Sequence, residues 1–189
     1  MKNRHLPEKH IDVLKPEYVP YRRIEKTMEF LAGHQPPPAR VLDLGVRNML
    51  SDRMRAAGYK VENTAGEDLD LEFGHLAEKP ADLVTAFEIL EHMVAPFNLL
   101  RSFNKGQKLI ATVPLKVWFS KAYWHPVDER DRHFHEFEPR QFDMLLEKAG
   151  WKIIGAEQWK MPAGKINGIR PVLRFFVPTY YAVFAEKTT

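Results

Sequence analysis

Imidazole and carboxylate side chains follow an apolar segment near the middle of the sequence. In "ADLVTAFEILEH", residues 81–92, Glu88, Glu91 and His92 come directly after a run that is typical of a buried strand. The reference pKa of histidine, about 6.5, suits proton removal from a hydroxyl group near neutral pH, so His92 is a candidate general base. Alternatively, Glu91 and His92 only cap and orient the helix that follows.

A second group of such residues lies in the aromatic and charged segment 118–139, which has the character of a lid over a binding site. His125, Asp128, His133 and His135 could bind zinc or iron, because imidazole and carboxylate groups are ligands for both ions. If the chain is extended there, His133 and His135 share one face and could instead line a pocket. Ordinary surface histidines are the third interpretation. The aromatic residues predict a pocket wall made of Trp118, Phe119, Tyr123, Trp124, Phe134 and Phe137.

The stretch "ARVLDLGVRNML", residues 39–50, has the form of a strand and a cofactor-binding loop that has lost most of its glycines. Glycine serves such loops by allowing positive φ and by letting the backbone approach a ligand closely. Only Gly45 remains, so the side chain of Arg47 must either point away or occupy ligand space. Asn48 is less disruptive, because asparagine tolerates a left-handed backbone.

The composition predicts one domain over residues 1–189, because 44% hydrophobic residues suffice for a sizeable core. No run approaches about 18 uncharged apolar residues, and "MKNRHLPEKH" has no apolar core, so we expect neither a membrane span nor a secretory signal and predict a cytoplasmic location. The lack of cysteine excludes disulfides, thiolate metal sites and cysteine nucleophiles. The 28 basic and 25 acidic residues are interspersed, which predicts no nucleic-acid-binding surface.

Strands and helices alternate along the chain, which predicts an α/β fold with a doubly wound, mostly parallel sheet and helices on both faces. Ligands of such sheets bind at the carboxyl ends of the strands, here around residues 43–48, 86–92 and 114–137. The expected helices are 21–34, 50–58 (with Ser51 as its cap), 95–106 and 138–150, and the expected strands are 40–45, 59–64, 81–87, 108–114, 151–159 and 179–187.

Four ordered segments, "VLDLG", "ADLVTAFEILEH", "KLIATVP" and "HEFEPRQFDMLLEKAGW", resemble class I S-adenosylmethionine-dependent methyltransferases of the type 11-like group. The strand followed by E-x-L-E-H is especially similar to small-molecule O-methyltransferases of the ubiquinone-biosynthesis type. The resemblance implies a Rossmann-like sheet of seven strands with the last one antiparallel, S-adenosylmethionine as cofactor and a small-molecule acceptor. It divides the domain into a helical lead-in (1–38), a cofactor half (39–113) and a part with the acceptor lid and the C-terminal strands (114–189).

The resemblance also assigns cofactor contacts. It places the carboxylate of Asp43 near the methionine ammonium of the cofactor, with Gly45 approaching the ligand closely and Glu88 in the cofactor pocket. Arg47 could pair with the methionine carboxylate or face solvent. The candidate cofactor-binding residues are Asp43, Leu44, Gly45, Val46, Arg47, Glu62, Asp68, Leu69, Phe87 and Glu88.

An acid that binds the ribose is expected about 20 residues beyond the loop aspartate, where this chain has Asn63. Glu62 is the neighbouring carboxylate, and Asp68 best fits a contact with the adenine amine. A solvated acidic turn is the alternative for "EDLD". The interval from Asp43 to Asp82 is shorter than usual in the family, which indicates that a helix, with or without a strand, has been trimmed.

The leading hypothesis is methyl transfer from S-adenosylmethionine to an oxygen, nitrogen or carbon of a small molecule, with no metal in the site and with His92, His133 and His135 as candidate catalytic residues. The missing glycines and the missing ribose acid favour an alternative, a non-catalytic binding module with the methyltransferase fold. A further alternative is a metal-dependent enzyme built on the histidines of residues 125–135. A nicotinamide oxidoreductase fits less well, because its pyrophosphate needs the close approach that Val46 and Arg47 obstruct.

Overall fold

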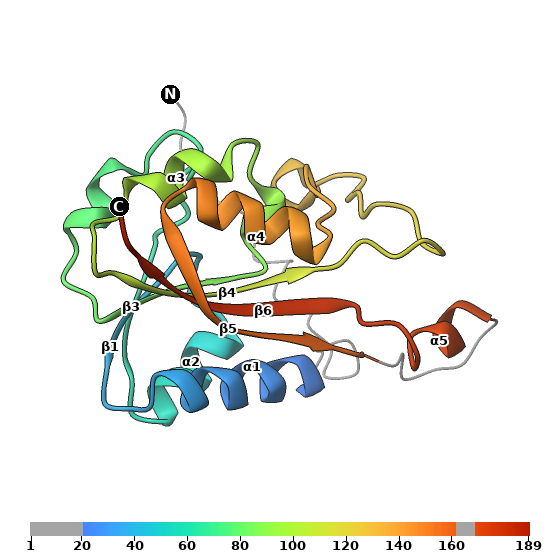
Figure 1. Ribbon diagram of the computed structural model, residues 1–189, viewed down its shortest axis with the longest axis horizontal. Coiled ribbons are helices and arrows are strands. Elements are labelled where there is room, and N and C mark those ends of the chain that lie inside the picture. Colours follow the sequence, from blue (N-terminus) through green and yellow to red (C-terminus); the bar gives the residue numbers. More distant parts are fainter. Residues whose placement is uncertain (1–20, 162–168) are drawn as a thin grey trace.

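Six strands form one mixed sheet in the computed structural model, which describes residues 21–161 and 169–189 (Figure 1). The strand order is β2-β1-β3-β4-β6-β5, and β6 alone runs antiparallel to its neighbours. This arrangement confirms the predicted mostly parallel sheet with an antiparallel last strand. The strands are β1 (Arg40–Asp43), β2 (Lys60–Asn63), β3 (Leu83–Phe87), β4 (Lys108–Pro114), β5 (Trp151–Trp159) and β6 (Tyr180–Lys187).

The seventh strand implied by the resemblance is not found within the described residues, so this expectation is corrected. The connection from β2 to β3 contains only the short 3-10 helix η3 (Gly74–Glu78), which leaves β2 at an edge of the sheet. A crossover between parallel strands normally needs a dozen or more residues. The short interval between Asp43 and Asp82 already contains two connections, from β1 to β2 and from β2 to β3, and leaves no room for a third, in agreement with the trimming predicted for this segment.

Helices cover both faces of the sheet (Figure 1). α1 (Tyr21–His34) and α2 (Met49–Ala56) lie on one face, and α3 (Pro96–Ser102) and α4 (Pro139–Lys148) lie on the other. A short helix, α5 (Ile169–Leu173), precedes β6. Among the described residues, no helix has both the length and the apolar character needed to cross a membrane.

The central strands are buried on both faces because consecutive side chains of a strand point in opposite directions. Val41 and Leu83 join the apolar cluster under α1 and α2, whereas the next residues, Leu42 and Val84, join the cluster that includes Leu99 of α3. This two-sided burial explains why these strands are continuous apolar runs in the sequence.

Helix α2 begins at Met49, and its cap is Asn48 rather than the predicted Ser51. The side-chain oxygen of Asn48 accepts hydrogen bonds from the backbone N–H groups of Leu50 and Ser51. In return, the Ser51 hydroxyl oxygen accepts a hydrogen bond from the backbone N–H of Asn48. The asparagine in the glycine-poor loop therefore starts the helix.

The lid, residues 115–138, connects β4 to α4 and is hydrogen-bonded to the segment that follows β3. The backbone N–H of Lys116 donates to the carbonyl oxygen of Phe137 (2.8 Å), which joins the two ends of the lid to each other. The carbonyl oxygen of Glu91, just after β3, accepts hydrogen bonds from the backbone N–H groups of Phe134 (2.8 Å) and His135 (3.1 Å). These bonds hold the lid beside the carboxyl end of β3.

Candidate functional site

A pocket of about 440 Å³ lies at the carboxyl ends of β3 and β4 and at the start of β6. We call it the strand-end pocket. Its walls come from α1, the 3-10 helix η4 (Leu90–His92), the lid and the segment before β6. The predicted regions 86–92 and 114–137 meet in it, at the sheet edge where parallel strands usually bind ligands. Its ionisable lining residues include Arg23, Glu88, Glu91, His92, His133 and Glu136.

Glu88 directly follows β3 and has a left-handed backbone with φ of 55°, which is unfavourable for a residue with a Cβ. Its Oε2 accepts a hydrogen bond from Arg23 Nη1, and its Oε1 accepts one from Thr112 Oγ1, both at 2.9 Å. Burial raises the pKa of Glu88, while the charge of Arg23 and the Thr112 hydrogen bond oppose the rise. Strained backbones that are fixed in this way concentrate at functional sites.

Glu91 is the most deeply buried carboxylate of the pocket, with 1% of its side chain exposed. Its Oε2 has no hydrogen-bond partner within residues 21–161 and 169–189. Burial, followed by the nearby charge of Glu88, raises the pKa of Glu91 well above its usual range. An unpaired buried carboxylate oxygen is costly, so this atom favours a proton or a cation beside it.

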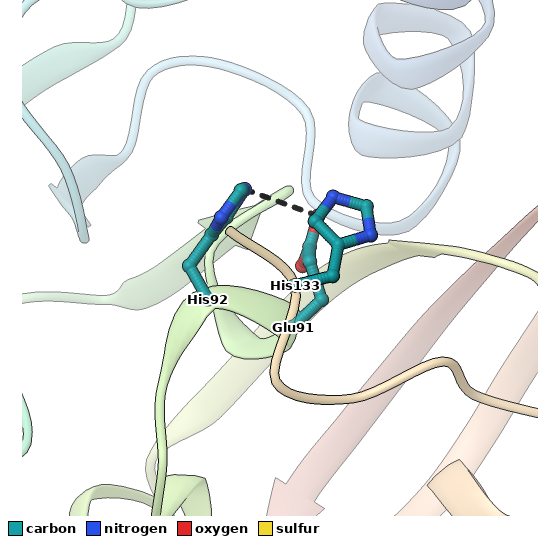
Figure 2. A group of neighbouring side chains, drawn as sticks. All are labelled: Glu91, His92 and His133. Atoms are coloured by element: carbon teal, nitrogen blue, oxygen red, sulfur yellow. Dashed lines mark ion pairs between the residues drawn. The ribbon is translucent and has the colours of Figure 1, made fainter. Parts of the chain in front are cut away.

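His92 and His133 lie next to Glu91, with their ring centroids 4.8 Å apart (Figure 2). His92 Nε2 is 3.8 Å from Glu91 Oε1. His92 Nδ1 is 3.2 Å from the carbonyl oxygen of Arg132, and His133 Nδ1 is 3.1 Å from Glu136 Oε1. Because both partners accept hydrogen bonds, we assign the protons of the neutral imidazoles to Nδ1 and the lone pairs to Nε2. Burial, followed by the nearby His133, lowers the pKa of His92, which favours this neutral form.

The third predicted catalytic histidine lies apart from this pair. His135 stacks on Phe137, and its Nε2 is 3.2 Å from the carbonyl oxygen of Val94. It is not among the residues that line the strand-end pocket. The structure thus brings together His92 and His133 of the three predicted histidines.

The metal group considered as an alternative, His125, Asp128, His133 and His135, does not form in the described part of the chain. His125 Nδ1 accepts a hydrogen bond from the backbone N–H of Asp128, whose carboxylate accepts one from the N–H of Arg130. These short-range turn contacts orient His125 and Asp128 toward their own segment. His133 alone of the four joins the pocket group.

The predicted cofactor loop belongs to a network of hydrogen bonds at the ends of β1 and β2. We call residues 43–48, with Asn63 and Thr64, the loop edge. Thr85 Oγ1 donates to Asp43 Oδ1 (2.7 Å), and Asn63 Nδ2 donates to Asp43 Oδ2 (2.8 Å). Burial raises the pKa of Asp43 from 3.8 to about 6, although these two hydrogen bonds oppose the rise. Asn63 pairs with Asp43 in the strand register and uses its amide to bind that carboxylate.

The backbone conformation and the close packing at position 45 require glycine. Its φ is 138°, and a Cβ at this position would lie 3.2 Å from Ile89 Cδ1. Its backbone N–H donates to Thr64 Oγ1 (2.7 Å). The flanking Leu44 is buried in the core, whereas Val46 is exposed.

Arg47 turns away from the strand ends. Its side chain is 70% exposed, and its Nε donates to Asp52 Oδ1 of α2 (2.7 Å). Of the two orientations considered from the sequence, the structure shows the solvent-facing one.

The remaining predicted cofactor residues have partners within the protein. Glu62 pairs with Lys79. Asp68 is exposed and its Oδ1 accepts a hydrogen bond from the backbone N–H of Asp70 (3.0 Å), as in a solvated acidic turn. Leu69 and Phe87 are partly buried against the two apolar clusters. A role for any of these residues in cofactor binding stays a prediction.

Sequence reasoning missed four residues of the strand-end pocket: Arg23, Arg174, Thr179 and Tyr180. Arg23 Nη1 donates to Tyr180 OH (3.3 Å), across 157 residues of sequence. An antiparallel last strand begins at the edge where the parallel strands end, so the implied topology could have indicated Tyr180. No comparable signal marks Arg23 within its helix.

The chain is similar to known proteins over most of its length. Residues 17–156 match a family model described as a methyltransferase domain. No curated protein gives a significant match to the sequence.

Solved structures share the architecture. The 1,6-didemethyltoxoflavin-N1-methyltransferase of Burkholderia thailandensis, solved with 1,6-didemethyltoxoflavin and S-adenosylhomocysteine, has a TM-score of 0.58 and 16% identity over 100% of this chain and 93% of its own. An S-adenosylmethionine-dependent methyltransferase of Methanosarcina mazei has a TM-score of 0.59 and 12% identity over 84% of this chain and 97% of its own. The [4+2]-cyclase SpnF has a TM-score of 0.54 and 16% identity over 88% of this chain and 81% of its own.

At these identities the likeness shows the fold alone, and the cyclase illustrates that one fold hosts different reactions. The family model, by contrast, covers most of the chain and includes the loop edge and the lid. The chain therefore belongs to the methyltransferase-domain family, which confirms the predicted relationship to class I S-adenosylmethionine-dependent methyltransferases.

Proposed function

We propose that this protein transfers the methyl group of S-adenosylmethionine to a hydroxyl oxygen of a small-molecule acceptor in the strand-end pocket. The observation that carries the proposal is the pair of imidazoles, His92 and His133, whose Nδ1 atoms face acceptors and whose Nε2 atoms are left with lone pairs. Such nitrogens accept a proton near neutral pH. The small-molecule substrate of the Burkholderia enzyme supports an acceptor of this class.

The reaction is a displacement at the methyl carbon. A lone pair of the acceptor oxygen forms the new bond to that carbon, while the carbon–sulfur bond breaks and its electron pair stays on sulfur. The hydroxyl proton moves to His92 Nε2 and then to solvent. Because the sulfonium is already activated, the protein's contribution is to align the reactants, exclude water and accept this proton.

The methionine end of the cofactor would lie at the loop edge. Asp43 keeps carboxylate lone pairs besides those that bind Thr85 and Asn63, and these can accept hydrogen bonds from an ammonium group. Glu88 follows β3, which is the neighbour of β1 in the sheet, and it lines the strand-end pocket. Its carboxylate is therefore suited to a position near the cationic sulfonium, between the loop edge and the acceptor.

Ligand-dependent thermal unfolding tests the cofactor part of this proposal. S-adenosylmethionine and S-adenosylhomocysteine should raise the unfolding midpoint, because a ligand of the native state stabilises it in proportion to the logarithm of its concentration over Kd. NADH should not. No stabilisation by either sulfur compound at millimolar concentration would contradict the proposal.

Two substitutions sharpen this test. Asp43→Ala should weaken S-adenosylhomocysteine binding at least about tenfold, the loss expected when a charge-assisted hydrogen bond is removed. Asp82→Asn is the matched control, because Asp82 is a carboxylate paired with Arg40 at the amino ends of the same strands. Equal loss of binding in both variants would place the cofactor elsewhere.

A second candidate function is ligand binding without methyl transfer. It is favoured by Asn63, which stands where a ribose-binding acid is expected and whose amide is already bound to Asp43 and to the carbonyl oxygen of Gly45. Screening methyl-labelled cofactor against panels of phenols, alcohols and amines separates the two functions. Cofactor binding without any labelled product would support the binding module.

A further inference from the structure

Three potential metal ligands converge at the wall of the strand-end pocket. Glu91 and His92 come from η4 after β3, and His133 comes from the lid (Figure 2). One ligand atom from each of the three lies within 4.8 Å of the other two. No other group of three such residues lies this close within residues 21–161 and 169–189.

The hydrogen bonds around the two imidazoles prepare them as ligands. His92 Nδ1 faces the carbonyl oxygen of Arg132 (3.2 Å), and His133 Nδ1 faces Glu136 Oε1 (3.1 Å). Metal-binding histidines commonly donate their second N–H to a carbonyl or a carboxylate, which fixes the tautomer and the orientation of the ring. Both rings therefore present Nε2 as a lone-pair donor.

Glu91 supplies an independent observation. Its side chain is 1% exposed, and its Oε2 has no hydrogen-bond partner in the described part of the chain. Buried polar atoms are paired in nearly all native structures, so an unpaired carboxylate oxygen needs a specific explanation. A carboxylate beside two imidazole lone pairs has only acceptors around it, and a bound cation satisfies all three groups.

We propose that Glu91, His92 and His133 bind a divalent transition metal ion. Two imidazoles and one carboxylate are typical ligands of zinc and of non-haem iron sites, whereas magnesium and calcium prefer oxygen ligands alone. Ligand atoms in a tetrahedral zinc site are about 3.4 Å apart, as follows from bond lengths of about 2.1 Å. The separation of 3.8 Å between His92 Nε2 and Glu91 Oε1 is close to this value.

The ion would have ligands from both the lid and the segment after β3. His133 reaches the group because the backbone of Phe134 and His135 is hydrogen-bonded to the carbonyl oxygen of Glu91. Three protein ligands leave coordination positions open toward the pocket. If the proposed function holds, the acceptor hydroxyl binds there, and the ion lowers the pKa of that hydroxyl so that its proton leaves to solvent. In that case the lone pair of His92 holds the ion instead of taking the proton.

The experiment measures metal binding without the cofactor, so its failure is distinguishable from failure of methyl transfer. The full chain is stripped with a chelator and titrated with Co²⁺ and Zn²⁺ by calorimetry, and the visible spectrum of the Co²⁺ form is recorded. We expect one ion per chain, absorption bands typical of mixed nitrogen and oxygen ligands, and much weaker binding of Mg²⁺. Elemental analysis of untreated protein should find the same stoichiometry.

Variants identify the ligands. His133→Asn and Glu91→Gln should each weaken Co²⁺ binding at least about 100-fold, and Glu136→Gln, which only loses a partner of His133, about 10- to 100-fold. His135→Asn is the matched control from the same lid segment and should bind Co²⁺ like the wild type. Circular dichroism checks folding. Because Glu91 is buried and its variant is the most prone to misfold, His133→Asn and Glu136→Gln on the lid decide the result.

Two outcomes overturn the proposal. The first is the absence of stoichiometric Co²⁺ or Zn²⁺ binding at micromolar concentration, which would mean that Glu91 is satisfied by a proton of its own. The second is binding that His133→Asn leaves unchanged while His135→Asn abolishes it, which would move the ion to another part of the lid.

Discussion

The loop edge and the strand-end pocket are adjacent along the carboxyl ends of the strands, yet their buried carboxylates differ in their hydrogen-bond partners. Asp43 of the loop edge receives hydrogen bonds from Thr85 and Asn63. Glu91 of the strand-end pocket has one oxygen without a partner in the described residues. Burial raises the pKa of both groups. Both oxygens of the loop-edge carboxylate have partners within the protein, whereas the carboxylate of the pocket favours a proton, an ion or a ligand group from outside the chain.

The backbone shows the same contrast. At the loop edge the residue with positive φ is Gly45, for which this conformation is unstrained. In the pocket it is Glu88, for which the same sign of φ is strained because of its Cβ. Conformational strain of about 1–3 kcal/mol is typical of such a residue. The surrounding contacts, from Arg23 on α1 and Thr112 on β4, keep Glu88 in place. We therefore expect changes in the pocket mainly to alter catalysis, and changes at the loop edge mainly to alter cofactor affinity or stability.

The largest effect is expected for His92→Ala. Losing a proton acceptor or a ligand in the pocket should lower kcat for methyl transfer to a hydroxyl acceptor by about 10²–10⁴-fold, while the affinity for S-adenosylhomocysteine stays within about twofold. Steady-state kinetics and calorimetry measure the two quantities. His75→Ala is the control, because His75 lies on η3, outside the strand-end pocket, and 53% of its side chain is exposed. A loss of cofactor affinity as large as the loss of kcat would contradict the separation of catalysis in the pocket from cofactor binding at the loop edge.

Asp43→Asn should reveal the cost of the buried charge at the loop edge. A folded-state pKa of about 6 lies above the reference value of 3.8, so the folded protein binds this proton more tightly than the unfolded chain. The free energy of unfolding therefore falls as the pH rises from about 4 through about 6, by about 3 kcal/mol for this group, and then levels off.

The asparagine variant should lack this fall, because its side chain does not titrate and can still bond to Thr85 and Asn63. Urea unfolding at a series of pH values, without cofactor, gives the difference between the two proteins. The comparison with the wild type isolates Asp43 from Glu88 and Glu91, which titrate in both. Parallel profiles would show that the carboxylate is better solvated than its burial indicates.

Gly45→Ala should destabilise the protein by about 1–3 kcal/mol, because the new Cβ combines an unfavourable φ with close contact to Ile89. Chemical unfolding measures the change. Gly33→Ala is a useful control, since Gly33 lies within α1 and has no atom near a new Cβ. That substitution should stabilise the protein by about 1 kcal/mol through helix propensity. A neutral Gly45→Ala would mean that the loop relaxes easily and that its glycine is not needed for geometry.

Much of the fold was predictable because apolar periodicity depends on residues close together in the sequence. The apolar runs 40–45, 81–87 and 108–114 contain the observed strands, and α1 coincides with the predicted 21–34. The start of α2 was predicted less well. Both Asn48 and Ser51 have side chains that can cap a helix, and only the folded geometry shows that Asn48 is the cap and that Ser51 lies in the first turn.

The site was predictable only in part, for a physical reason. Glu88, Glu91 and His92 follow one strand, so their proximity is a local property of the sequence. The choice of His133 rather than His135 as their neighbour depends on hydrogen bonds from the lid backbone to Glu91, which lies 43 and 44 residues before the two donors. The contribution of Arg23 depends on how α1 packs against the sheet. Such long-range contacts leave no periodic signal in a single sequence.

The smallest effect is expected for Arg47→Ala, which tests the loop residue that departs most from the family pattern. Arg47 is paired with Asp52 on an exposed surface, and such pairs contribute little to stability. Removing the side chain should therefore leave both the unfolding midpoint and the affinity for S-adenosylhomocysteine essentially unchanged. Calorimetry under identical salt conditions measures the affinity. A tenfold or greater loss would show that Arg47 leaves Asp52 and binds the carboxylate of the ligand. The loop edge would then resemble the strand-end pocket, because one of its charged side chains, Arg47, would also have its partner in a molecule from outside the chain.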